Sequence, residues 1–321
     1  MNETLAVEQL EEKARELRKL VIRQVAAAGS GHVAGPLGFA DVMAVLYFRI
    51  LRLRPEEPDW PDRDLFVMSN GHYAPLLYAA MAMRGFLSES ELMSLRQFGS
   101  RLQGHPERVK LSGLETTSGP LGCGLSQAAG MAYHLQNSER FVYCSLGDGE
   151  LDEGNIWEAA MFAAKYKLGR LIAIVDRNNI QIGGDTEQVM PLDDLGEKWH
   201  SFGWQVQEVD GHDIARIIAA VESAQAVRER PSLIIAHTVP GRGVDFMEGD
   251  YRWHGRAPNA EQAAAALTQL GLLAKKQPEE GKQVLNLFSW ADNFDPEVIK
   301  AFEKKYNCKV NYDVFANNEE L

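Results

Sequence analysis

Cysteine, long hydrophobic runs and positive charge are all scarce in this sequence. Its three cysteines, Cys123, Cys144 and Cys308, are too few and too scattered for a disulfide framework, and none pair at a zinc-site spacing. No apolar stretch is long enough to span a bilayer, and the charged N-terminal segment is unlike a secretory signal. The formal net charge of −12 argues against binding to nucleic acid or to an anionic membrane. We therefore expect a cytoplasmic protein with no nucleic-acid and no membrane partner.

Apolar residues, by contrast, are plentiful enough for a full core. Of the 321 residues 45% are hydrophobic and 24% are charged, which are the proportions of an ordinary globular protein. The length suggests two domains, or one large domain with an extension. Near residues 275–281 the sequence becomes charged and contains proline and glycine, as linkers do. We predict a main domain over residues 1–276, and a linker with an extension of uncertain role over 277–321.

Apolar runs typical of strands alternate with stretches of helical periodicity. The expected strands are residues 64–69, 141–146, 171–175, 204–209 and 232–238. The expected helices include residues 10–25, 39–49, 125–136 and 156–166. This alternation predicts an α/β fold with a doubly wound, mainly parallel sheet and helices on both of its faces. Beyond the linker the sequence reads as strand, helix, strand, so we expect a short β-α-β-like extension.

Polar residues follow two neighbouring strands at the point where each strand ends. Gly147-Asp148-Gly149 comes directly after one strand, and Asn178-Asn179 follows the next strand along the chain. Ligands of open α/β sheets bind at the carboxyl ends of the strands. Carboxylate and amide oxygens, with glycines that allow close backbone approach, suit a hard cation that carries a diphosphate. Taken alone, Asp148 could equally be a helix N-cap, and the two asparagines a plain turn.

Several loop segments combine glycine with a residue that could face a ligand. Four histidines stand beside glycines in predicted loops: Gly31-His32, Gly71-His72, Gly104-His105 and His254-Gly255. There the imidazole can contact a ligand while the backbone also approaches it closely. A glycine-rich segment, residues 119–124, precedes a helix. Each feature is weak evidence by itself, but one shared binding site accounts for all of them.

Taken together, residues 5–275 resemble the N-terminal, diphosphate-binding half of transketolase. The matching stretches are Ser30-Gly-His32, Ser69-Asn-Gly-His72, Gly104-His-Pro-Glu107, Glu115-Thr-Thr-Ser-Gly-Pro-Leu-Gly122, Gly147-Asp-Gly149, Asn178-Asn-Ile180 and His254-Gly255. Full-length transketolases continue into a pyrimidine-binding domain and a C-terminal domain, which this sequence lacks. The resemblance therefore implies the N-terminal subunit of a split transketolase, completed by a separate C-terminal subunit that carries the pyrimidine-binding domain. It also implies a homodimeric contact within a heterotetramer.

The resemblance implies thiamin diphosphate and Mg²⁺ as cofactors, with roles for particular residues. The Mg²⁺ ligands would be Asp148, the Asn178 side chain and the Ile180 carbonyl. The residues that bind the organic cofactor would be His72, Gly119, Pro120, Leu121, Gly149, Asn178 and His254. The catalytic residues that face the sugar would be His32, His105 and His254. Glu153 would join a carboxylate network at the subunit contact, and Cys123 stands where the family commonly has glutamine.

The implied reaction passes a two-carbon ketol unit from a ketose phosphate to an aldose phosphate, as in the pentose phosphate pathway. Xylulose 5-phosphate is the family's default donor, but split transketolases also act on branched or sulfonated sugars. Histidines suit the proton handling because their ordinary pKa is about 6.5. The family's cofactor-activating glutamate and its phosphate-binding arginines belong to the pyrimidine-binding domain. We therefore expect this chain alone to be inactive and to bind thiamin diphosphate weakly.

Two other interpretations stay open at this point. The α subunit of a thiamin-dependent 2-oxoacid dehydrogenase shares the Gly147-Asp148-Gly149 triplet, but it lacks the stretches at 30–32 and 104–107. The other interpretation is a non-catalytic fused protein, because residues 284–321 resemble the start of periplasmic polyamine-binding proteins. A fragment that short cannot form a two-lobed cleft or a substantial core. We therefore interpret it as a fused or truncated remnant.

Overall fold

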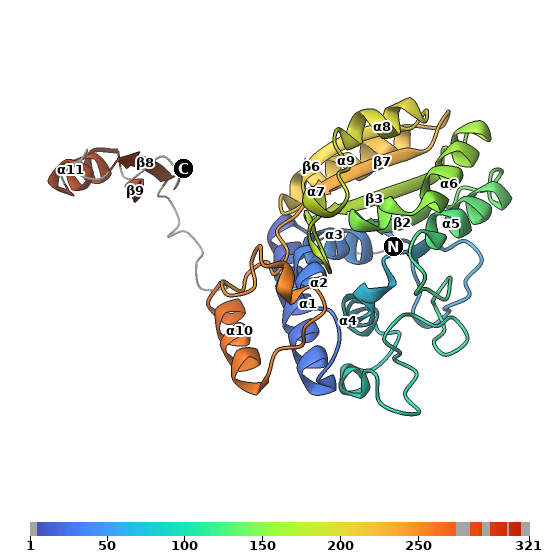
Figure 1. Ribbon diagram of the computed structural model, residues 1–321, viewed down its shortest axis with the longest axis horizontal. Coiled ribbons are helices and arrows are strands. Elements are labelled where there is room, and N and C mark those ends of the chain that lie inside the picture. Colours follow the sequence, from blue (N-terminus) through green and yellow to red (C-terminus); the bar gives the residue numbers. More distant parts are fainter. Residues whose placement is uncertain (1–4, 274–282, 291–295, 307, 316–321) are drawn as a thin grey trace. The chain divides into compact units, whose positions relative to one another are not determined.

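The computed structural model describes residues 5–273, 283–290, 296–306 and 308–315, which fall into two compact units, Met1–Gly271 and Leu272–Leu321. A single sheet of five parallel strands forms the centre of the first unit (Figure 1). Its strands, in spatial order, are β1 (Leu65–Met68), β2 (Val142–Gly147), β3 (Leu171–Arg177), β7 (Ser232–His237) and β6 (Gln205–Asp210). The predicted parallel α/β sheet is therefore confirmed.

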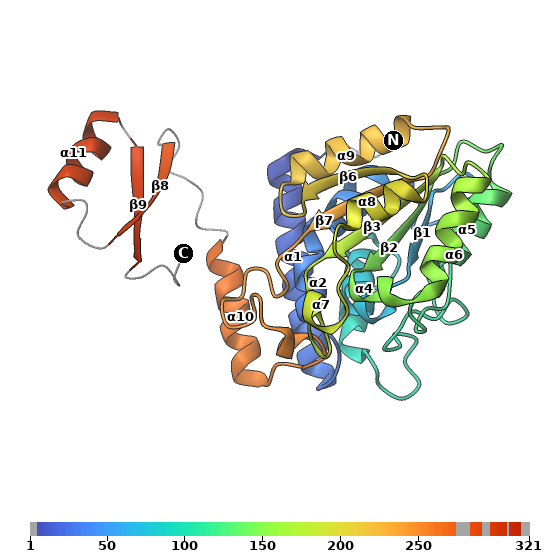
Figure 2. The same ribbon diagram turned by 45° about the horizontal axis from the view of Figure 1, so that its top comes forward.

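Two apolar cores cover the two faces of this sheet, because successive side chains along a strand point to opposite faces. On β3, Ile172 and Ile174 enter one core, whereas Ala173 and Val175 enter the other. The first core is covered by the helices α1 (Val7–Ala28), α3 (Ala40–Val45), α4 (Ala74–Arg84) and α9 (Ile214–Ala226). The second is covered by α5 (Cys123–His134), α6 (Gly154–Lys165) and α8 (Leu195–Ser201). Figure 2 shows helices on both sides of the sheet, as the sequence predicts.

Further elements lie in the first unit or, in the case of α10, begin in it, and several of them were not expected from the sequence. They are α2 (Ala34–Gly38), α7 (Thr186–Val189), α10 (Ala260–Leu273), and the hairpin of β4 (Ile180–Gln181) and β5 (Gly184–Asp185). A π-helical turn covers Leu46–Ile50, and 3₁₀ turns cover Gly71–Tyr73, Glu89–Ser94, Gly149–Asp152 and Tyr251–Trp253. The helix expected over 39–49 is therefore α3 followed by the π-helical turn. None of the described helices has the length and apolar content that a membrane span requires.

The strand ends all meet at one edge of the sheet because the strands run parallel. Gly147 of β2 lies opposite Asp176 of β3, and Arg177 of β3 lies opposite His237 of β7. The segments that follow these strands therefore leave the sheet side by side. This register brings together residues that are far apart in the sequence.

The second unit contains β8 (Gln283–Trp290), α11 (Pro296–Tyr306) and β9 (Cys308–Phe315). The two strands pair in parallel, which confirms the expected strand, helix, strand order. On α11 the rings of Phe302 and Tyr306 lie 4.6 Å apart between centroids. The domain boundary predicted at residue 276 lies outside the described residues.

Replacing Ile174 with alanine should lower the free energy of unfolding by about 2–5 kcal/mol, because it leaves a cavity beside the central strand. Ile174 is 1% exposed. Met161→Ala on α6 is the control, since that side chain is 55% exposed and its loss should cost less than about 0.5 kcal/mol. Urea unfolding of the purified chain measures both. Equal losses would contradict this placement of Ile174.

Candidate functional site

A cavity of about 270 Å³ lies at the carboxyl edge of the sheet. The predicted site residues that line it are His32, His72, His105, Gly119, Leu121, Asp148, Gly149, Asn178, Ile180 and His254. Pro120 is exposed in the same loop as Gly119 and is not part of this lining. The fold therefore brings nearly all of the predicted site residues together, from seven separate segments of the chain, while their individual roles stay predictions.

Three imidazole rings form a cluster on one side of the cavity. Ring centroids lie 4.9 Å apart for His32 and His72, 5.4 Å for His32 and His254, and 5.2 Å for His72 and His254. Burial lowers the pKa of His32 to about 4, with smaller contributions from the charges of His254, Arg96 and His105. Burial also lowers the pKa of His72 and of His254. The cluster is therefore neutral at neutral pH, so each ring has one donor and one acceptor nitrogen.

Two atoms of this cluster lack a partner within the described residues. The Nδ1 atoms of His32 and His254 are both buried without a hydrogen bond. Buried polar atoms in folded proteins nearly always have a partner, so unpaired ones require an explanation. Both rings line the cavity, although these two nitrogens themselves are buried.

His105 stands at a more exposed position than the other three histidines. Burial lowers its pKa, and the nearby positive charge of Arg96 acts in the same direction. The loop before it passes close to that arginine: a Cβ on Gly104 would lie 2.8 Å from the Arg96 Nε atom. A larger residue at this position would require the Arg96 side chain to move.

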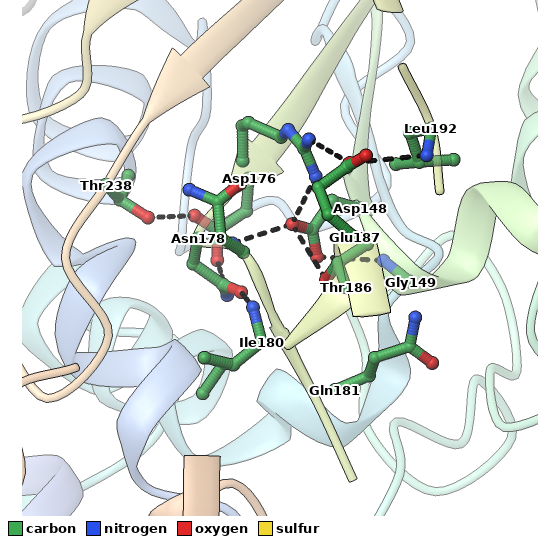
Figure 3. A network of polar contacts seen from close by, with 12 residues as sticks. Asp148, Gly149, Asp176, Asn178, Ile180, Gln181, Thr186, Glu187, Leu192 and Thr238 are labelled. Carbon is green, nitrogen blue, oxygen red and sulfur yellow. Dashed lines mark hydrogen bonds and ion pairs between the residues drawn. The ribbon is translucent and has the colours of Figure 1, made fainter. Parts of the chain in front are cut away.

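Asp148 is the N-cap that the sequence left open as one interpretation, and its role as a cation ligand stays a prediction. Its Oδ1 accepts a hydrogen bond from the Gly149 amide at 2.8 Å, which makes it the N-cap of a short 3₁₀ turn. Its Oδ2 accepts from the Asn179 amide at 2.7 Å and from the Arg177 guanidinium at 3.2 Å, as Figure 3 shows in part. Burial raises the pKa of Asp148, and the charge of Arg177 opposes that rise. The carboxylate thus lines the cavity in a fixed orientation.

The Asn178 side chain is held on all sides by hydrogen bonds. Its Nδ2 donates to the Tyr73 hydroxyl and to Asp176 Oδ2, both at 2.9 Å. Its Oδ1 accepts from the Ile180 amide at 3.1 Å. Burial raises the pKa of Asp176 to about 7. The carboxyl group of Asp176 also accepts a hydrogen bond from the Thr238 hydroxyl.

Sequence reasoning missed Tyr73, Asp176 and Thr238, although a signal for the acid was present. Asp176 is a carboxylate at the end of an apolar strand, two residues before a predicted ligand. Such a residue in a buried run requires hydrogen-bond donors from elsewhere in the fold. Those donors come from the start of α4 and from the end of β7, which sequence spacing does not connect.

Glu150 is a further residue that the sequence analysis missed. It is 2% exposed and accepts hydrogen bonds from the amides of Gly122 at 2.8 Å and Gly147 at 3.0 Å, and from the Ser69 hydroxyl. It therefore ties the glycine-rich loop to the ends of β1 and β2. The signal available was an acid directly after the Gly-Asp-Gly triplet.

Glu153 and Cys123, which the sequence analysis also singled out, lie near the triplet and the glycine-rich loop. Glu153 is exposed, and a Cβ on Gly122 would lie 2.6 Å from its Cβ, so the two segments touch. Cys123 is a half-buried free thiol at the start of α5, with its Sγ 3.9 Å from Asn155 Nδ2. The proposed carboxylate network at a subunit contact stays a prediction.

The lining fits a diphosphate with a hard cation and apolar rings. Within the described part of the chain, no three Asp, Glu, His or Cys side chains converge as a ready-made metal centre. A hard cation here would instead use mixed oxygen ligands, from Asp148, Asn178 and the Ile180 carbonyl, together with diphosphate oxygens. Leu121 and Ile182 supply an apolar rim that suits the rings of a cofactor.

Comparisons with known proteins agree with this geometry. The family model described as "Transketolase, thiamine diphosphate binding domain" matches residues 10–311. The chain is 42% identical over 266 residues to a subunit of the 6-deoxy-6-sulfo-D-fructose transketolase from a Clostridium species, covering 81% of this chain and 96% of that one. It is 40% identical over 278 residues to one of the subunits of the apulose-4-phosphate transketolase from Phocaeicola vulgatus, covering 86% and 99%.

Solved structures show the same likeness, but to larger chains. The transketolase of Leishmania mexicana matches with a TM-score of 0.79 at 33% identity, over 84% of this chain and 42% of that one. The transketolase of Campylobacter jejuni matches with a TM-score of 0.78 at 36% identity, over 83% and 43%. The chain thus spans less than half of the length of these two transketolases, and nearly all of the length of the two subunits above.

The family match includes part of the extension, since it continues to residue 311. The likeness of residues 284–321 to polyamine-binding proteins is not tested by it and stays a prediction. The match covers most of the chain, and two relatives of at least 40% identity are covered almost completely. The chain therefore belongs to the transketolase family, in which it corresponds to the N-terminal, thiamin diphosphate-binding part.

Proposed function

We propose that this chain is the N-terminal subunit of a split transketolase, which transfers a two-carbon ketol unit from a ketose phosphate to an aldose phosphate in the cytoplasm. The observation that carries this proposal is the convergence of Asp148, Asn178 and Ile180 with three neutral histidines around one cavity. Oxygen ligands on one side and proton-handling groups on the other are what a cation-held diphosphate cofactor and a sugar require.

The cofactors in this proposal are thiamin diphosphate and Mg²⁺, and the bound thiamin would supply the chemistry that cleaves the C2–C3 bond of the ketose. The chain's own contribution is binding and orientation. Asp148, Asn178 and the Ile180 carbonyl would hold the cation, while His72 and Gly149 would contact the diphosphate. The residues proposed to lie beside the rings are Gly119, Pro120 and Leu121.

The histidines are proposed to act on the sugar. His32 and His254 would move protons, because each is neutral and lines the cavity. His105, which stands nearer to solvent, would contact the donor hydroxyls. A well-placed acid or base contributes about 10²–10⁴-fold to a rate.

A separate subunit is part of the proposal, and the cavity itself supports it. Leu121 and Ile182 line the cavity but are 37% and 78% exposed. Large apolar side chains at the rim of a site suit coverage by another surface. We propose that a polypeptide with the pyrimidine-binding domain covers them, in a heterotetramer of two chains of each kind. The names of two relatives, which are called transketolase subunits, support this arrangement.

The choice of sugar is a separate part of the proposal. Xylulose 5-phosphate is the first donor to test, and the relatives' names add a sulfonated fructose and apulose 4-phosphate as candidates. The 2-oxoacid dehydrogenase alternative predicts carbon dioxide as a product. Chromatographic analysis of the products distinguishes it from ketol transfer, which releases an aldose.

When it is purified alone, the chain should show no ketol transfer. A tagged copy of the chain should capture its partner from native cells, and the captured complex should transfer the ketol unit when thiamin diphosphate and Mg²⁺ are present.

Asp148→Asn should lower the ketol transfer activity of the complex by about 100-fold or more, because a cation ligand loses its charge. Asp152→Asn is the matched control, since Asp152 is an exposed acid in the same turn. Robust transfer by the chain alone, or equal losses in both variants, would falsify the proposal.

Acidification should destabilise the chain through His32. Its pKa is about 4 in the folded chain, below the ordinary value near 6.5. Between these values the unfolded chain takes up a proton that the folded chain does not, so the free energy of unfolding falls as the pH falls from 6.5 toward 4. His32→Gln should therefore lose less stability than the wild type over this range. Urea unfolding at several pH values measures both chains, and parallel pH curves would contradict the neutral state of His32.

Removing the residues after Lys276 should leave the activity of the complex unchanged, because the proposed site residues all lie within the first unit. The measurement is transfer activity of the captured complex with full-length or shortened chain at equal concentration. A collapse of activity in the shortened chain would show that the extension takes part in function.

A further inference from the structure

Asp176 is a fully buried carboxylate at the end of β3, where it accepts three side-chain hydrogen bonds. The donors are the hydroxyls of Tyr73 and Thr238 and the amide nitrogen of Asn178, as Figure 3 shows for the two residues it labels. They come from three places: the start of α4, the end of β7, and the loop after β3. No ion pair to Asp176 is found among the described residues, so hydrogen bonds alone stabilise its buried oxygens.

This arrangement distinguishes the two ends of the Asn178 amide. The oxygen and nitrogen of an asparagine side chain are nearly equal in shape, so their partners decide the orientation. Nδ2 donates to Asp176 and to the Tyr73 hydroxyl, both at 2.9 Å, whereas Oδ1 accepts from the Ile180 amide, and the residue lines the cavity. The reversed amide would place its oxygen against a carboxylate oxygen and lose both donated bonds. One orientation is therefore strongly favoured.

Tyr73 is itself fixed in place, so it can serve as a reference point for Asn178. It is 1% exposed, and a Cβ on Gly35 would lie 2.2 Å from its hydroxyl oxygen, so only glycine leaves room for it. Its hydroxyl donates to Asp176 and accepts from Asn178. Its ring also packs edge-on against His72, at 4.7 Å between centroids.

We propose that Asp176 is a positioning residue: together with Tyr73 it holds the Asn178 amide with its oxygen toward the cavity, and so sets the affinity of the site for a divalent cation. The inference rests on the proposed function, because it takes Asn178 as a ligand of the cation that carries the diphosphate. Asp176 and Tyr73 would not contact the cation themselves, but they would determine which atom of the Asn178 amide contacts it. Groups that orient metal ligands in this way typically change metal affinity by about 10–100-fold when they are lost.

Mn²⁺ binding to the captured complex in the presence of thiamin diphosphate tests this inference, with free Mn²⁺ followed by electron paramagnetic resonance. Asp176→Asn should weaken Mn²⁺ binding by about 10–100-fold, because the acceptor for the Asn178 amide is lost. This variant also removes a negative charge near the cation. Tyr73→Phe keeps that charge and removes the other acceptor of the Asn178 amide, together with one hydrogen bond to Asp176. It should weaken binding by about threefold or more, which corresponds to one lost hydrogen bond.

Thr238→Val is the matched control, because Thr238 binds the same carboxylate without touching Asn178. It should change Mn²⁺ affinity by less than about twofold. Thermal unfolding without cation measures the structural effect of each variant separately. Weakening by Tyr73→Phe, with none by Thr238→Val, supports the inference even if Asp176→Asn does not fold.

Two results would overturn the inference. The first is Mn²⁺ affinity that is unchanged in Tyr73→Phe, in a complex whose wild type binds Mn²⁺. The second is weakening by Thr238→Val as large as that by Tyr73→Phe, since this would reflect general loss of packing rather than orientation of Asn178. If the wild-type complex binds no Mn²⁺ with thiamin diphosphate, the proposed function fails, and this inference fails with it.

Discussion

Parallel pairing of β2 with β3, and of β3 with β7, is the constraint on which the site depends. In this register three strands end beside one another, so the residues that follow them share one edge of the sheet. The two cores on the opposite faces hold these strands in place, because most side chains of β2, β3 and β7 are buried in one core or the other. A shift of β3 by one residue would exchange its two faces and move Asn178 away from Asp148.

Burial shifts the pKa values of the acids and of the histidines at this edge in opposite directions. On one side the acids Asp148, Glu150 and Asp176 are buried, and burial raises the pKa of each, although hydrogen bonds oppose the shift. On the other side burial lowers the pKa of the clustered histidines and keeps them neutral. The acids are thereby held by fixed donors, whereas two buried imidazole nitrogens have no hydrogen-bond partner among the described residues. This division matches a site with a cation at one end and a proton-handling sugar pocket at the other.

Much of the fold could be predicted from the sequence, because strands buried on both faces appear as continuous apolar runs. The five strands of the sheet and the strand, helix, strand order of the extension were found in this way. The short hairpin of β4 and β5 was not, since two-residue strands have no detectable period. The site residues were predicted from histidines beside glycines, from polar residues after two strands and from the resemblance to transketolase, and they line one cavity, except for Pro120.

The sequence by itself determined the α/β class, the membership in a family, and the set of residues expected at the site, because these follow from local patterns and from short motifs. Only the tertiary structure decided how those residues are held. Asp176 binds a tyrosine more than 100 positions before it and a threonine 62 positions after it. No periodicity or motif spacing records such contacts, because they arise where separate elements pack against one sheet edge. The orientation of the Asn178 amide, and the neutral state of the histidines, come from that packing.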